Sequence, residues 1–148
     1  LRAGISLWLV VLLLVLAVVG TRIYTRNQVV NAVGGKEDYD EGIAWLRSRY
    51  DIPLIFLTLG KDGSRAYCGD VRTEQAGFKM NTIETTGAGD TFCASVLNFV
   101  LDHGVENLTA EQLTEMLRFA NAAAYLVTTK KGAIRSMPEK AQVLEILK

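Results

Sequence analysis

Residues 84–92 read ETTGAGDTF, a glycine-rich turn that opens directly into a predicted helix. Two glycines around one alanine let the backbone approach an anion closely. Because the helix begins there, the N–H groups of about Ala88, Gly89 and Asp90 point at one spot and suit a phosphoryl group in transfer. The Asp90 carboxylate can accept the proton of an attacking hydroxyl. Glycine before a helix is also ordinary capping chemistry, so this pattern alone leaves both interpretations open.

Upstream of this segment the pattern predicts a helix, a hairpin and a further strand. Residues 37–50 carry apolar side chains at helical spacing and end before a proline. LIFLTL at 54–59 is a short apolar run, typical of a buried parallel strand. The Asp-Gly pair within residues 61–64 indicates a hairpin turn. EQAGFKM at 74–80 is expected to form another strand.

Downstream of the segment three helices are predicted. The first runs from about Ala88 to His103, and this histidine is expected to stabilise the helix end rather than to catalyse. The second begins at Thr109, where Gln112 completes a capping box. A loop, TTKKGAIRSM, then leads to Pro138 at the start of the last helix. The alternation of helices and strands predicts an α/β layer fold.

Charge and cysteine content argue against several classes of function. Lysine plus arginine number 16 and aspartate plus glutamate also number 16, so the net charge of zero gives no electrostatic case for binding nucleic acid. The two cysteines, Cys68 and Cys93, fit neither a disulfide framework nor a zinc site, which indicates a reducing compartment. Cys93 lies one turn after Asp90, and we expect it to be a small core thiol rather than a nucleophile.

The first part of the chain has a different character from the rest. Residues 3–20 carry no charged side chain, and as a helix they would span about 27 Å, close to the hydrocarbon thickness of a bilayer. We therefore expect a hydrophobic, transmembrane-like helix at 1–24, a linker at 25–36 and one globular unit at 37–148. A buried element is the alternative, although the unbroken apolar run at 7–19 is long for a strand.

The glycine-rich segment resembles the second signature of the phosphofructokinase-B (pfkB) family, which includes ribokinase, fructokinase and adenosine kinase. That signature is usually written with aspartate in place of Glu84. FLTLGKDGSRAY at 56–67 looks like the family's strand and hairpin before the motif, and RFANAAAYLVTTKKGAIRSMP at 118–138 looks like its adenine-side helix and loop. The resemblance covers residues 37–148. It implies the C-terminal, ATP-side half of a ribokinase-like layered α/β sandwich.

The resemblance also implies an activity and a set of site residues. The activity is ATP-dependent phosphorylation of a sugar hydroxyl, most like that of fructokinases, with ATP and Mg²⁺ as cofactors and a nucleoside acceptor as an alternative. The catalytic group is Asp90 as base with an anion hole of Gly87, Ala88 and Gly89. The residues expected to contact the nucleotide are Thr58, Gly60, Asp62, Gly63, Asn121, Gly132 and Ala133. Those expected to hold a monovalent cation such as K⁺ are Glu84, Thr86, Val127, Lys130, Gly132 and Ser136.

The family's first half, which supplies the sugar contacts, has no counterpart in this sequence. Residues 1–36 offer only an apolar run and a short linker in its place, and the chain begins with leucine rather than methionine. Three interpretations stay open: a fragment or frame-disrupted kinase, a membrane-tethered derivative, and a truncated or vestigial nucleotide-binding module without turnover. We expect the kinase half to be cytoplasmic, anchored to the membrane if residues 3–20 insert. A homodimer also stays open.

Overall fold

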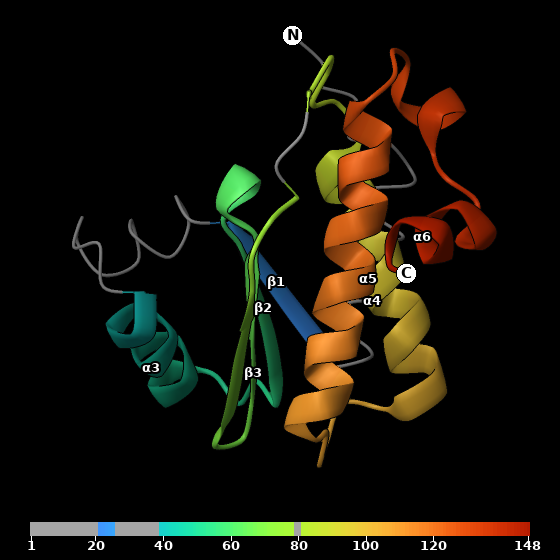
Figure 1. Ribbon diagram of the computed structural model, residues 1–148. Helices are drawn as coiled ribbons and strands as arrows, with labels where there is room; N and C mark the ends of the chain where they lie inside the picture. The colour runs from blue at the N-terminus through green and yellow to red at the C-terminus, as the bar shows by residue number, and fades with distance from the viewer. Residues whose placement is uncertain (1–20, 26–38, 79–80) are drawn as a thin grey trace, which may run out of the picture.

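The computed structural model describes residues 21–25, 39–78 and 81–148 of the chain. Within these residues four strands form one sheet in the order β1-β2-β3-β4. Figure 1 shows helix α3 on one face of this sheet and helices α4 and α5 on the other, with α6 beyond α5. The predicted α/β layer fold is therefore confirmed.

The centre of the sheet is strand β2 (Leu54–Thr58), which lies between two neighbours of opposite direction. Strand β1 (Thr21–Thr25) pairs with it in parallel. Strand β3 (Ser64–Cys68) pairs with it antiparallel, and β4 (Val71–Gln75) continues the hairpin at the edge. Residues 54–57 are fully buried because helices cover both faces, which explains the uninterrupted apolar run and confirms the predicted strand.

Alternate residues of β2 and β3 supply two separate cores. Leu54, Phe56 and Ala66 face α4 and α5, and they pack with buried side chains from both helices. The other face packs on α3 (Tyr39–Arg49) through the buried cluster of Ile43, Leu46, Ile52, Ile55, Leu57 and Tyr67. The predicted helix at 37–50 is thus confirmed, and Ile43 and Leu46 are the side chains that it buries against the sheet.

The helices on the other face begin and end close to where local signals place them. Helix α4 spans Ala88–His103, and the His103 Nδ1 atom lies 3.0 Å from the carbonyl of Phe99. Helix α5 spans Ala110–Thr128 and has the predicted capping box, with both reciprocal hydrogen bonds between Thr109 and Gln112. Helix α6 spans Lys140–Ile146, so it begins two residues after the predicted proline start and is capped by Glu139.

One predicted strand is too long and one observed strand was not predicted, for the same physical reason. The strand predicted at 74–80 is wrong at 76–78, because its partner β3 begins at Ser64, the residue that pairs with Gln75. Residues 79–80 lie outside the described residues. After Gln75 the chain packs against the turn at 60–63, where the Gly77 N–H donates to the Asp62 carbonyl at 3.3 Å. Strand β1 was not predicted. It lies at 21–25, where the sequence analysis expected the end of the transmembrane-like helix (1–24) and the start of the linker. In both cases the pairing partner, not the local sequence, determines the strand.

The predicted membrane segment at 3–20 lies outside the described residues, as do residues 26–36 of the predicted linker. Among the helices that the structure does describe, none has the length and apolar content needed to cross a bilayer.

The turn between β2 and β3 generates a prediction on Gly63. Its φ is +108°, and a Cβ built there would lie 2.1 Å from the Gln75 carbonyl oxygen. We expect Gly63→Ala to lower the free energy of unfolding by about 3 kcal/mol or more, measured by urea denaturation. Gly69 is the matched control, because its φ is also positive but the space around it is open. Gly69→Ala should lower stability by only about 1–2 kcal/mol. Equal losses for both variants would contradict the predicted clash.

Candidate active site

The glycine-rich turn before α4 is fixed by close packing. Gly87 is the N-cap of the helix with φ +87°, and a Cβ there would lie 3.0 Å from the Cβ of Ala133. The Gly87 carbonyl accepts hydrogen bonds from the N–H and the hydroxyl of Thr91, at 2.9 and 2.8 Å. Glycine is therefore required at 87 both by its backbone angle and by the loop that packs on it.

One of the three N–H donors predicted for an anion hole already has a partner in the structure. The Ala88 N–H donates to the Thr85 carbonyl at 3.2 Å, so it closes the turn. Gly89 and Asp90 follow in the first turn of α4, where a helix leaves N–H groups without intrahelical partners. No atom would lie within 4 Å of a Cβ at Gly89, so the approach to the backbone there is open. Asp90 is exposed at the same helix end.

Cys93 follows Asp90 by one turn and is partly buried in α4. Burial, and then the charge of Asp90, raise the pKa of its thiol to about 11. The thiol therefore stays protonated near neutral pH, when it is a poor nucleophile. This agrees with the expectation that Cys93 is not a nucleophile, although the side chain is only partly buried and lies outside the buried core clusters.

An open cleft of about 1240 Å³ extends from the first turn of α4 to the hairpin, and it is somewhat larger than ordinary small-molecule sites. It brings together five of the seven residues predicted to contact a nucleotide. Gly132 and Ala133 lie outside its lining. The described residues that line it are Thr58, Gly60, Lys61, Asp62, Gly63, Gly77, Phe78, Asn81, Thr82, Thr85, Ala88, Gly89, Phe92, Asn121, Ala124, Tyr125 and Thr128.

Asn121 uses its side-chain amide to join α5 to the hairpin. Its Oδ1 accepts a hydrogen bond from the buried Ser64 hydroxyl at 2.9 Å, and its Nδ2 donates to the Gln75 carbonyl at 3.2 Å. Nδ2 also lies 3.5 Å from the carbonyl of Ala76. Asn121 lines the cleft, and these bonds assign its polar atoms to holding the hairpin.

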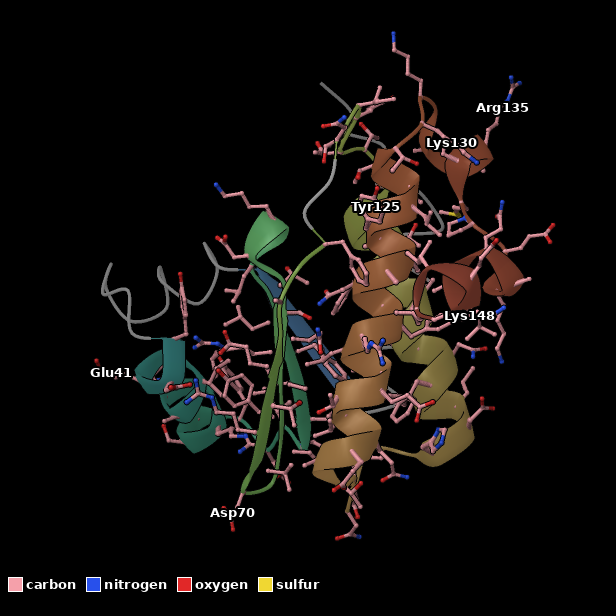
Figure 2. All side chains as sticks on the ribbon, viewed as in Figure 1. Glu41, Asp70, Tyr125, Lys130, Arg135 and Lys148 are labelled. Atoms are coloured by element: carbon pink, nitrogen blue, oxygen red, sulfur yellow. The ribbon has the colours of Figure 1, made fainter. Side chains whose placement is uncertain are left out.

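Two aromatic residues of the cleft were missed by sequence reasoning. The rings of Phe78 and Tyr125 stack with centroids 5.7 Å apart and planes inclined by 20°. Tyr125 lies on the upper part of α5, as labelled in Figure 2. Its position four residues after Asn121 could have placed it on the same helix face. Phe78, in contrast, gives no local signal because it follows the end of β4.

Glu84 ties the glycine-rich segment to the loop after α5. Its carboxylate accepts a hydrogen bond from the Gly132 N–H at 3.1 Å, while the N–H groups of Ile83 and Glu84 donate to the Thr128 carbonyl. The Gly132 N–H, followed by the Thr86 hydroxyl and the charge of Lys131, lowers the pKa of Glu84. The predicted cation residues lie on these two joined segments, at 84–86 and 127–136.

The ligands available for a metal ion near this site are limited. Within the parts of the chain that the structure describes, no group of three or more histidine, cysteine, aspartate or glutamate residues could hold one. A cation site here would have to use main-chain and hydroxyl oxygens in addition to one carboxylate. The Ser136 hydroxyl donates to the Lys131 carbonyl at 2.9 Å, so it already has a partner in the loop.

Comparison with known proteins agrees with the resemblance. The model of the family "pfkB family carbohydrate kinase" matches residues 18–140, so the match includes β1 and begins before the predicted domain boundary. Fructokinase-1 of Zea mays is 33% identical over 113 residues, which cover 76% of this chain and 35% of that protein. The chain thus spans about a third of the length of this curated relative.

Solved structures share the fold. A fructokinase of Vibrio cholerae O395, in a fructose, ADP and calcium ion bound form, superposes with a TM-score of 0.74 at 24% identity, covering 93% of this chain and 44% of that one. Arabidopsis thaliana ribokinase, complexed with ribose and ATP, gives a TM-score of 0.70 at 30% identity over 86% and 40% of the two chains. The predicted ribokinase-like α/β fold is therefore confirmed.

A first prediction concerns the hydrogen bonds of Asn121. Asn121→Ala leaves the buried Ser64 hydroxyl without its partner, so we expect a loss of about 1–3 kcal/mol in the free energy of unfolding, measured in urea. Asn98→Ala is the control, because Asn98 is an exposed asparagine of α4 and should change stability by less than about 0.5 kcal/mol. If both variants are equally stable, the amide does not hold the hairpin.

A second prediction concerns the pH dependence of stability at Glu84. Because its pKa is lower in the folded state than in the unfolded state, its ionised form stabilises the fold above the unfolded pKa. This contribution disappears as the pH falls through the lowered pKa. Glu84→Gln should therefore be less stable than the parent chain at pH 7, and the difference in denaturation midpoint should shrink steadily as the pH is lowered through the range in which the carboxylate becomes protonated. A difference that persists unchanged in acid would contradict the ionic origin.

Proposed function

The chain belongs to the pfkB family of carbohydrate kinases, and we propose that it transfers the γ-phosphoryl group of ATP to a hydroxyl of a fructose-like sugar. The observation that carries the proposal is the position of Asp90. Its exposed carboxylate lies in the first turn of α4, directly after Ala88 and Gly89, which line one end of the open cleft. The fructokinase relatives support a fructose-like acceptor.

In the proposed reaction Asp90 accepts the proton of the sugar hydroxyl as that oxygen bonds to the γ-phosphorus. The bond between this phosphorus and its bridging oxygen breaks, and ADP leaves with that oxygen. The first-turn N–H groups of Gly89 and Asp90, with the positive end of the α4 dipole, stabilise the charge on the transferred group. Gly87 provides the backbone angle of the turn. Ala88 closes the turn, because its N–H donates to the Thr85 carbonyl.

The cleft supports placing the nucleotide along the hairpin and α5. Gly60 and Gly63 have positive φ, and the turn that they bound lines the cleft next to Thr58 and Asp62. We assign the triphosphate to this turn and to the start of α4, and the base to the α5 side. The ATP bound in the related Arabidopsis ribokinase supports the choice of nucleotide.

The residues present fit Mg²⁺ bound with the nucleotide better than they fit a second, monovalent cation. Mg²⁺ supplies charge neutralisation when bound to a nucleotide, and since the described residues offer no carboxylate cluster, it fits here as an ion carried largely by the phosphates. A monovalent cation would lie between Glu84 and the 127–136 loop. Glutamate has one methylene more than the aspartate of the family signature, and its carboxylate already accepts the Gly132 N–H. This arrangement favours the loop contact over a cation site.

A second candidate function is nucleotide binding without turnover by this chain alone. The observation that favours it is length, because the chain spans 35% of Fructokinase-1 of Zea mays. In this proposal strand β1 and residues 37–148 form the ATP side of the kinase. The sugar contacts are not supplied by residues 1–36. Phosphoryl transfer depends mainly on holding the acceptor in line, so a chain without these contacts would bind ATP and release ADP very slowly.

The test of the proposed function is Asp90→Asn in a chain completed with the sugar-binding half of a fructokinase relative. We expect kcat to fall by about 100- to 10,000-fold, because the base is lost, with little change in ATP affinity. An ADP-release assay with fructose measures both. Asp102→Asn, at the opposite end of α4, is the matched control and should keep parental turnover.

The outcomes separate the two candidate functions. Near-parental kcat in Asp90→Asn would remove this residue from the role of base. ATP binding by the 148-residue chain without sugar-dependent ADP release would support the binding module. Sugar-dependent turnover of the same chain, abolished by Asp90→Asn, would exclude it.

A further inference from the structure

The stacked pair of Phe78 and Tyr125 has no part in the proton transfer or the anion hole, although both rings line the same cleft as Ala88 and Gly89. We propose that Tyr125, supported by Phe78, is the surface on which the base of the bound nucleotide stacks, and therefore a determinant of nucleotide affinity. The inference rests on the proposed function, since it assumes that the cleft holds ATP.

The position of Tyr125 on α5 suits this role. It lies three residues before Thr128, whose carbonyl accepts the N–H groups of Ile83 and Glu84 just ahead of the glycine-rich turn. One helical turn is about 5.4 Å, so the ring lies roughly one turn along the cleft wall from the segment that leads into the phosphate site. A base joined to the phosphates through a ribose would extend along this wall.

The ring is held in place and still accessible. Phe78 packs against the buried cluster of Ala122, Ala123 and Val143, so it is anchored between α5 and α6. Tyr125 stacks on Phe78 with nearly parallel planes and is itself half-buried in the lining of the cleft. Figure 2 shows Tyr125 on the upper part of α5. An aromatic surface fixed in this way loses little conformational freedom when a base stacks on it.

Asn121 is the alternative contact to the base on this wall, but its side-chain amide already forms hydrogen bonds within the protein. The amide of Asn121 bonds with the Ser64 hydroxyl and the Gln75 carbonyl, so breaking these bonds would be needed before it could bind a base fully. Stacking requires no such exchange, because every base presents a π-face to an aromatic ring. The geometry therefore favours Tyr125 over Asn121 as the main contact to the base.

The experiment measures binding of ADP and of inorganic tripolyphosphate, which lacks a base, to the full chain by calorimetry. We expect Tyr125→Ala and Tyr125→Leu to weaken ADP binding by about 10-fold or more, as loss of base stacking does in other proteins, and to leave tripolyphosphate binding unchanged. Tyr125→Phe keeps the ring and should bind ADP like the parent. Tyr50→Ala is the control, because Tyr50 is an exposed tyrosine directly after α3, the helix that covers the other face of the sheet.

Two outcomes would overturn the inference, and a third would contradict the proposed function. Parental ADP affinity in folded Tyr125→Ala or Tyr125→Leu would overturn the inference. An affinity of the parent chain for ADP no higher than that for inorganic pyrophosphate, which has the same two phosphates without the nucleoside, would also overturn it, without requiring any variant to fold. Failure of the parent chain to bind either probe would instead contradict the proposed function, and the inference would fall with it.

Discussion

The burial of strand β2 on both faces is the constraint from which the rest of the structure follows. Residues 54–57 expose no surface, so one helix layer must cover each side of the sheet. The α3 layer covers one side through Ile55 and Leu57, and the α4–α5 layer covers the other through Leu54 and Phe56. Because β2 ends at the turn next to α5, the same packing places the glycines of the hairpin opposite the first turn of α4.

Asp90 meets two electrostatic requirements that oppose each other. A carboxylate in the first turn of a helix is stabilised by the dipole and by free N–H groups. An incoming triphosphate would be repelled by the same carboxylate and attracted by the same helix end. The exposure of Asp90 eases this conflict, because solvent screens its charge until a ligand covers the site. The glycine at 89 lets the anion approach the backbone rather than the carboxylate.

The sequence predicted those parts of the fold that depend on neighbouring residues. The capping box at Thr109, the apolar run of β2 and the glycine-rich turn are local signals, and each forms as expected. Strand β1 and the end of β4 depend on partners elsewhere in the chain, and no local pattern contains that information. The same holds in the cleft, where the bond between Asn121 and Ser64 and the stack of Phe78 on Tyr125 join distant segments. Sequence reasoning could name the residue types of the site but not these pairings.

Strand β1 has a practical consequence for handling this protein. It occupies one side of β2 along the full register from Thr21 to Thr25, so it satisfies main-chain N–H and C=O groups of the most apolar strand in the sheet. A recombinant product trimmed to residues 37–148 would leave that side of β2 open. An uncovered apolar strand edge recruits strands from other molecules. Expression boundaries chosen from the motif alone would therefore favour inclusion bodies, and a soluble preparation should start ahead of residue 21.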